Sequence, residues 1–134
     1  MPHAFMIRKK CFNLVGSFYE KYLIIYEESE LAIRINKLRF KVLAVPNAIV
    51  YHNIPLETDN ERNLGLHQKD RVYLLARNRY IFMKRNASKI GFALFLLIFQ
   101  TIITIHYLLV LLRIGKYNFI NDYLKGIFDG LKEN

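Results

Sequence analysis

The chain has 134 residues, of which 53% are hydrophobic and 14% aromatic, and its formal net charge is +9. This composition excludes a disordered chain, and the single cysteine excludes an internal disulfide. The length suits one domain or part of one, and the excess of cations favours an anionic partner such as a membrane surface, nucleic acid or a phosphorylated substrate.

The N-terminal part of the chain predicts a strand and two helices. Residues 4–7 are a short apolar run that indicates a strand, and the helix after it should end at Gly16 because glycine commonly terminates helices. Residues 17–26 are aromatic and irregular. A helix of about three turns is expected over 27–38, where apolar residues recur at helical spacing.

Two β-branched runs follow this helix, on either side of Pro46 and Asn47. They read FKVLAVP and AIVYH, and they predict two strands, or a strand and a bent extension, with a turn between them. The polar residues 53–70 predict a long loop. A helix should resume near Arg71 and run through VYLLARNRYIFMKR.

Residues 90–112 contain no charged side chain. A helix of that length is roughly 34 Å long, which is enough to cross the hydrocarbon core of a bilayer. Because both flanks carry cations, a helix that lies in the membrane plane or re-enters it is the main variant of a spanning helix. A buried helix of a large soluble protein is the remaining alternative.

The residues around this apolar segment predict its orientation and its surroundings. Cations are more numerous before the segment than after it, which favours a cytoplasmic front end. The tail after it is amphipathic, with Phe119, Tyr123 and Ile127 about one helical turn apart. We therefore expect the tail to form a helix on the surface of the protein or of the membrane.

Three glutamates, Glu27, Glu28 and Glu30, stand at the start of the helix predicted over 27–38. Acids in the first turn offset the positive end of the helix dipole, which accounts for Glu27 and Glu30. At 100° per residue, Glu28 lies within about 20° of Ile35 on the apolar face, whereas Glu30 points the opposite way. A partly desolvated Glu28 would suit the role of a general base, and a structural acid at a helix start is the alternative.

The order of short motifs along residues 4–52 resembles the C-terminal half of family 2 glycosyltransferases, which have the GT-A fold. The motifs are Ile7-Arg8-Lys9, Gly16, Phe18-Tyr19-Glu20, Tyr26-Glu27-Glu28-Ser29-Glu30-Leu31, Arg34, Phe40-Lys41, Val45-Pro46 and Val50-Tyr51-His52. Farther along, Arg77-Asn78 and Gly126 with Asp129-Gly130 are similar to members that carry a membrane-associated tail.

This resemblance implies an α/β fold in two parts. Residues 1–70 would be the acceptor-side part of a catalytic domain, a partial GT-A fold made of helices and a few short strands. Residues 71–134 would be a membrane-associated helical tail that contains the hydrophobic segment 90–112. The protein would then act at the cytoplasmic face of a membrane.

The resemblance also implies inverting transfer of a hexosyl or rhamnosyl-type sugar from a nucleotide-sugar donor to a hydroxyl of a glycan or lipid-linked acceptor. Glu28 matches the carboxylate that removes the acceptor proton, with Glu27 and Glu30 as support. His52 matches a histidine that holds the divalent metal in some members, and imidazole ligation suits Mn²⁺ better than Mg²⁺.

Three further residues, Arg77, His67 and Gln68, are candidates to contact the acceptor or the diphosphate. For Arg77 the alternative is an ordinary ion pair with an acid on a neighbouring turn, and for His67 and Gln68 it is a solvated position in the polar loop. For His52 the alternative is a hydrogen-bonded histidine at a strand end.

The sequence departs from the family pattern in two respects that bear on function. Glu28 stands where the family has Asp, and an extra methylene shifts a base by more than about 1 Å, which can cost roughly a hundredfold in rate. The N-terminal half, which binds the nucleotide and supplies an Asp-x-Asp metal motif, has no counterpart here. We therefore expect sugar transfer only if a separate chain supplies that half and the metal.

Two other functions are weighed against sugar transfer. A small membrane-anchored interaction protein without chemistry is the alternative. Nucleic-acid binding is not expected, because the cations are scattered over several predicted elements and the uncharged segment 90–112 is an unusual companion for such a function.

Overall fold

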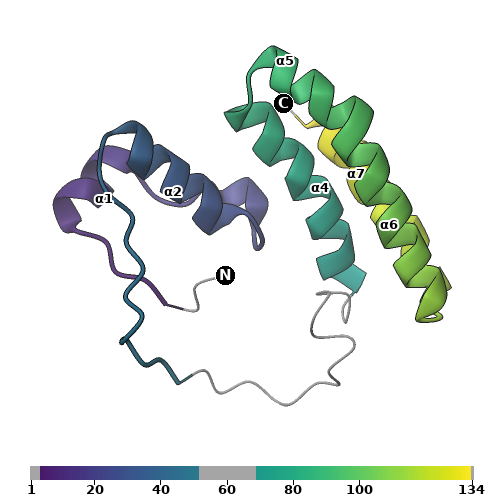
Figure 1. The fold of residues 1–134 in the computed structure, drawn as a ribbon, viewed down its shortest axis with the longest axis horizontal. Coiled ribbons are helices and arrows are strands. Elements are labelled where there is room, and N and C mark those ends of the chain that lie inside the picture. Colours follow the sequence, from purple (N-terminus) through teal and green to yellow (C-terminus); the bar gives the residue numbers. More distant parts are fainter. Residues whose placement is uncertain (1–3, 52–68, 134) are drawn as a thin grey trace. The chain divides into compact units, whose positions relative to one another are not determined.

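The computed structural model describes residues 4–51 and 69–133, which fall into two compact units, Met1–Glu57 and Thr58–Asn134. The described helices of the first unit are α1 (Lys9–Val15), the 3₁₀ turn η1 (Glu20–Tyr22) and α2 (Glu27–Lys37). Those of the second unit are α4 (Lys69–Asn86), α5 (Lys89–Leu94), the π-helical turn η2 (Phe95–Phe99), α6 (Gln100–Arg113), the 3₁₀ turn η3 (Tyr117–Phe119) and α7 (Ile120–Lys132). Figure 1 shows their arrangement.

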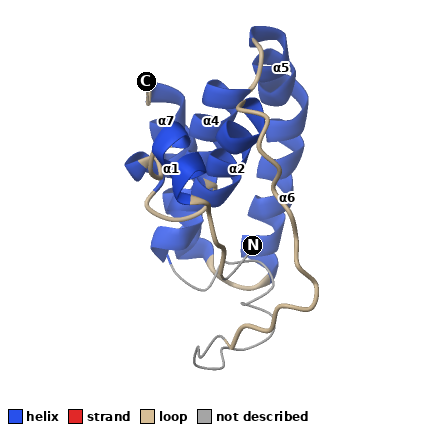
Figure 2. Cartoon of the chain, turned by 90° about the vertical axis from the view of Figure 1, so that its left-hand side faces the viewer, coloured by secondary structure: helices blue, strands red, loops and turns tan. Residues whose placement is uncertain are grey.

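The prediction of an α/β fold was wrong, because the described residues are all-helical and contain no strand (Figure 2). The predicted strand at 4–7 is irregular, and so are both β-branched runs between Phe40 and Tyr51. The turn between the runs is confirmed, since the amide of Ala48 donates to the carbonyl of Val45 at 3.1 Å. β-branched composition gives only a weak preference for strands, and a strand forms only where a second backbone pairs with it.

The predicted helices are confirmed. The first ends at Gly16, whose φ of 80° is in the left-handed region that glycine adopts at little cost. α2 begins at Glu27 as expected, and α4 contains the helix expected from Arg71. Helical periodicity is a strong signal where it persists over three or more turns, which explains why these elements were predictable.

α4 and α7 are in close contact because α7 places two glycines against α4. A Cβ added at Gly126 would lie 2.4 Å from the carbonyl oxygen of Tyr73. One added at Gly130 would lie 2.6 Å from the carbonyl oxygen of Arg77. Neither separation leaves room for a side chain. The backbones of α4 and α7 can approach this closely because α7 has glycine at both positions.

The helix formed by α5, η2 and α6 runs alongside this pair. Its residue Leu111 joins Val72, Ala76 and Tyr123 in one fully buried cluster. Farther towards its start, the ring of Phe95 packs edge-on against Tyr80 with 5.6 Å between ring centroids. The second unit is therefore a three-helix bundle, with its core where α4, α6 and α7 meet.

The helix Lys89–Arg113 has 25 residues and a mean hydropathy of 2.3. Among residues 4–51 and 69–133 it is the one helix that is long and apolar enough to cross a membrane. Only 17% of its most apolar stretch is buried within the unit. Water-exposed apolar surface of this extent is unusual for a soluble bundle.

Replacing Gly126 by alanine should destabilise the second unit by about 2 kcal/mol, even though alanine gains about 1 kcal/mol in helix propensity. The added methyl group would meet the carbonyl of Tyr73 and force α7 away from α4. Urea unfolding followed by circular dichroism measures the change. Asn121→Ala, at an exposed position of α7, is the control and should not destabilise the protein. Equal stability of Gly126→Ala and the parent would contradict the close packing described here.

The stability of the second unit should fall as pH rises from 10 to 12. Burial is the main reason that the pKa of Tyr80 is raised from 10.0 to about 12, with a smaller contribution from Tyr123. Between these values the unfolded chain has lost the Tyr80 proton and the folded chain keeps it, so raising the pH favours unfolding. Unfolding free energies of the parent and of Tyr80→Phe across this range test the prediction. The free energy of unfolding of Tyr80→Phe should fall less over this pH range than that of the parent. It should still fall somewhat, because burial also raises the pKa of Tyr73.

Candidate functional site

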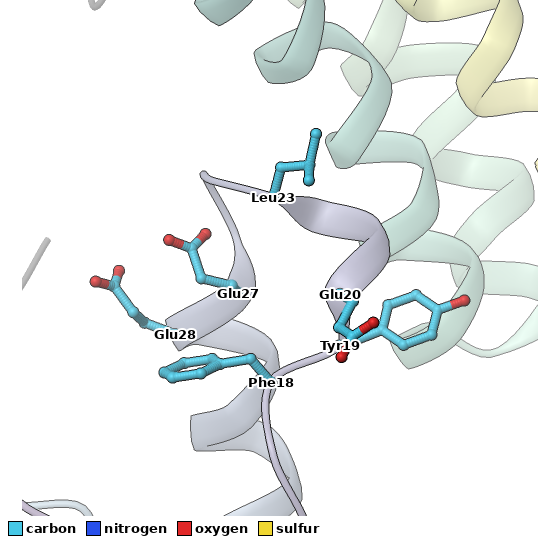
Figure 3. Close-up of a pocket in the computed structure, with 6 residues that line it drawn as sticks. All are labelled: Phe18, Tyr19, Glu20, Leu23, Glu27 and Glu28. Atoms are coloured by element: carbon cyan, nitrogen blue, oxygen red, sulfur yellow. The ribbon is translucent and has the colours of Figure 1, made fainter.

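The first unit contains an open hollow of about 440 Å³, here called the acidic hollow (Figure 3). Its lining residues are Phe18, Tyr19, Glu20, Leu23, Glu27 and Glu28. They come from η1, from the segment before it and from the start of α2. Three of the six are carboxylates and two are aromatic, so the hollow combines hydrogen-bond acceptors with apolar surface.

A strained turn connects η1 to α2 and positions the acids. Leu23, Ile25 and Tyr26 have φ values of 59°, 68° and 78°, and residues other than glycine rarely adopt positive φ values. Each such residue costs of the order of 1 kcal/mol or more and persists only where surrounding contacts hold it. Burial of Tyr22 (0% exposed) and Ile25 (4% exposed) supplies those contacts.

Glu27 and Glu28 are the first two residues of α2 and therefore lie at the positive end of its dipole. Figure 3 shows both side chains extending in the same direction, with the ring of Phe18 beside Glu28. Glu28 is half-buried and lines the acidic hollow. Its carboxylate can accept a hydrogen bond, or a proton, from a hydroxyl group bound there.

The prediction that Glu30 points away from the packed side of α2 was wrong, because Glu30 is buried with 1% exposed. Its two carboxylate oxygens accept from Nε of Arg34 at 3.0 and 2.9 Å. The same guanidinium donates to the backbone carbonyls of Val15 and Ser17, the second at 2.7 Å. The helical wheel missed this arrangement because it places apolar side chains inside and does not anticipate a buried ion pair.

Glu30 is therefore a structural acid in the folded chain. Through Arg34 it connects α2 to the backbone that follows α1, and that backbone leads directly to Phe18 and Tyr19. The pair thus holds the two sides of the acidic hollow in place. The three glutamates of the sequence cluster separate into two that line the hollow and one that supports it.

The other predicted site residues are not brought to the acidic hollow by the described structure. His52, His67 and Gln68 lie outside the described residues. Arg77 belongs to the second unit, where its guanidinium donates to the side chain of Asn78 at 3.1 Å and pairs with Glu133 at 3.0 Å. Arg77 is thus ion-paired, but its partner is an acid far along the chain and not one on a neighbouring turn, as the structural alternative had expected.

The described residues do not provide a ligand set for the divalent metal that the family resemblance implies. Nowhere in 4–51 or 69–133 do three side chains of the His, Cys, Asp or Glu type come together as they would around an ion. Glu20, Glu27 and Glu28 line the acidic hollow without converging on one point. A metal held there would need ligands from outside this part of the chain.

Four lining residues were not among the predicted site residues: Phe18, Tyr19, Glu20 and Leu23. The first three form the aromatic–acid motif of the family resemblance, and that motif was the signal that could have identified them. Leu23 carries no such signal, because its place in the hollow depends on the left-handed backbone at that position.

Comparison of the chain with protein-family models, with curated proteins and with solved structures gives no match. Its function is therefore argued from the chemistry of the acidic hollow and from the apolar helix.

Replacing Arg34 by alanine should destabilise the first unit by about 3 kcal/mol or more, because it removes the guanidinium that pairs with the buried carboxylate of Glu30. Urea unfolding measures the loss. Lys37→Ala, at an exposed position of the same helix, removes the same charge and should change stability by less than about 0.5 kcal/mol. Equal stabilities of the two variants would show that the Glu30–Arg34 pair does not hold the hollow together.

Proposed function

We propose that the chain is the acceptor-side part of a membrane-associated glycosyltransferase and that it works with a separate chain that binds the nucleotide sugar. One observation carries this proposal. Two of the segments that carry the family resemblance, Phe18-Tyr19-Glu20 and Glu27-Glu28, line the same hollow. The segments are close in sequence, and the strained turn between them folds the chain so that both line the hollow.

In the proposed reaction Glu28 is the catalytic base. The hydroxyl oxygen of the acceptor attacks the anomeric carbon of the donor sugar, its proton passes to the Glu28 carboxylate, and the bond from that carbon to the diphosphate breaks. The nucleoside diphosphate leaves with the bonding electrons, and attack from the opposite side inverts the anomeric centre. Glu20 and Glu27 are placed to accept hydrogen bonds from other acceptor hydroxyls, and Phe18 offers an apolar face.

The proposal assigns the donor side of the reaction to the partner chain. That chain would supply the nucleotide site and most ligands of a divalent metal, Mn²⁺ or Mg²⁺, which would neutralise the diphosphate. The present chain would supply the base and the acceptor site. The acceptor would be a glycan or a lipid-linked molecule at the cytoplasmic face of a membrane, because the anionic lipids of that leaflet attract the cations that flank the apolar helix.

Glu28→Gln should lower sugar transfer at least about a hundredfold, because glutamine cannot take the acceptor proton. The assay uses membranes from cells that co-express this chain with the candidate partner, a mixture of labelled nucleotide sugars, and separation of lipid and glycan products. Ser29→Ala, at the exposed neighbouring position, is the control and should retain transfer. Circular dichroism of the purified variants checks that both fold.

Full transfer by Glu28→Gln would remove Glu28 from the reaction. Transfer that requires the partner but not this chain would overturn the proposed function as a whole.

A small membrane-anchored interaction protein is the second candidate. It is favoured by the all-helical structure of the described residues, which resembles a binding module more than half of a sheet-based catalytic domain. It predicts that Glu28→Gln affects stability alone. It also predicts that calorimetry detects no Mn²⁺ binding, even with the candidate partner present.

A further inference from the structure

The outer face of the helix Lys89–Arg113 is a continuous apolar stripe, here called the lipid stripe. Its members recur every three or four residues from one end of the helix to the other, and each is between 43% and 76% exposed. They are Ile90, Leu94, Ile98, Ile102, Ile105, Leu109 and Leu112. Such spacing places them on one side of the helix, so the exposed apolar surface is a band along it.

The opposite face of the same helix is committed to the bundle. Phe95 and Leu111, near its two ends, are 5% and 0% exposed. Between them, the ring of Tyr107 stacks on Tyr123 of α7 with 5.5 Å between centroids, and the guanidinium of Arg79 lies 5.4 Å from the Tyr107 ring. Figures 1 and 2 both show α6 running alongside the other helices of this unit.

The helices that hold this inner face are highly charged. α4 carries seven charged side chains and α7 carries four. Several are tied into polar contacts within the unit, such as Tyr73 with Asp129 at 2.9 Å and Arg77 with Glu133 at 3.0 Å. If Lys89–Arg113 crossed a bilayer, α4 and α7 would enter the hydrocarbon with it, and ionised side chains there are strongly disfavoured.

Cations flank the lipid stripe at both ends. Arg85 and Lys89 precede it and Arg113 follows it, and all three are exposed. No acidic residue occurs between Asp70 and Asp122. A crossing helix needs cations chiefly on its cytoplasmic side, whereas a helix lying in the interface can place both ends among anionic headgroups.

We propose that the second unit binds the surface of an anionic membrane with Lys89–Arg113 lying in the plane of one leaflet. The lipid stripe enters the outer part of the acyl chains, the flanking cations meet the headgroups, and α4 and α7 remain on the water side. The occupant of the stripe is lipid, because its length, its apolar composition and the cations at its ends match an anionic membrane surface. This inference deepens the membrane association proposed above and does not depend on sugar transfer.

Tryptophan fluorescence can distinguish an in-plane helix from a crossing helix, because the chain contains no tryptophan. Ile98→Trp and Leu109→Trp place single emitters on the lipid stripe at exposed positions that tolerate a larger side chain. Each full-length variant is bound to vesicles of equal parts phosphatidylglycerol and phosphatidylcholine. Lipids brominated at different carbons then report the depth of each emitter.

The in-plane arrangement predicts equal depths for the two emitters, about 5–10 Å below the headgroups. A crossing helix predicts depths that differ by up to roughly 16 Å, since eleven residues separate the two positions. Unequal depths would overturn the in-plane proposal and leave membrane association standing.

A matched pair of charge variants tests whether the lipid stripe makes the contact. Ile105→Glu, on the stripe, should lower the vesicle partition coefficient about tenfold or more, whereas Asn121→Glu, on α7, adds the same charge and should lower it much less. Equal losses of vesicle binding in the two variants would show that the lipid stripe does not make the contact with the membrane. Failure of the parent chain to bind anionic vesicles would overturn both this inference and the membrane association, and sugar transfer with the partner chain would still be testable.

Discussion

The second unit is governed by one constraint: the helix Lys89–Arg113 has no charged side chain between its ends, but the bundle buries only one of its faces. α4 and α7 cover the inner face at Phe95, Tyr107 and Leu111, and the outer face stays exposed along its whole length. Apolar surface of this extent must be removed from water by something outside the unit. The in-plane membrane contact that we propose would account for both faces at once, because a lipid surface accepts apolar side chains while water solvates charged helices behind it.

The first unit depends in a similar way on the pairing of Glu30 with Arg34. A buried carboxylate is tolerated only when a cation and hydrogen bonds compensate for its lost hydration, and Arg34 provides both the charge and a connection to the backbone at Val15 and Ser17. The pair therefore supports the turn that presents Glu27 and Glu28 at the acidic hollow. Acids that look equivalent in the sequence differ in role, because Glu30 is buried and paired with Arg34 whereas Glu27 and Glu28 line the hollow.

The helices were predicted correctly from the sequence, whereas the predicted strands are absent from the described residues. α2, α4 and Lys89–Arg113 each contain several turns of consistent pattern, and the local glycine signal correctly ended α1 at Gly16. The runs at 4–7 and 40–51 have strand-like composition, yet a strand also requires a neighbouring backbone that composition cannot specify. Of the residues predicted for a site, Glu27 and Glu28 line the hollow and Glu30 does not. Phe18 and Glu20 were available only as members of a motif.

The sequence by itself determined the helical elements, the long uncharged segment and the position of an acidic cluster at a helix start, because each follows from interactions among residues close together in the chain. Tertiary structure alone decided which glutamate is buried, that two motifs share one hollow, and that charged helices line one side of the apolar helix. These features depend on contacts between residues far apart in sequence, such as Tyr107 with Tyr123 or Arg34 with Val15. Local periodicity carries no information about such partners, since it records which face of an element is apolar and not what that face meets.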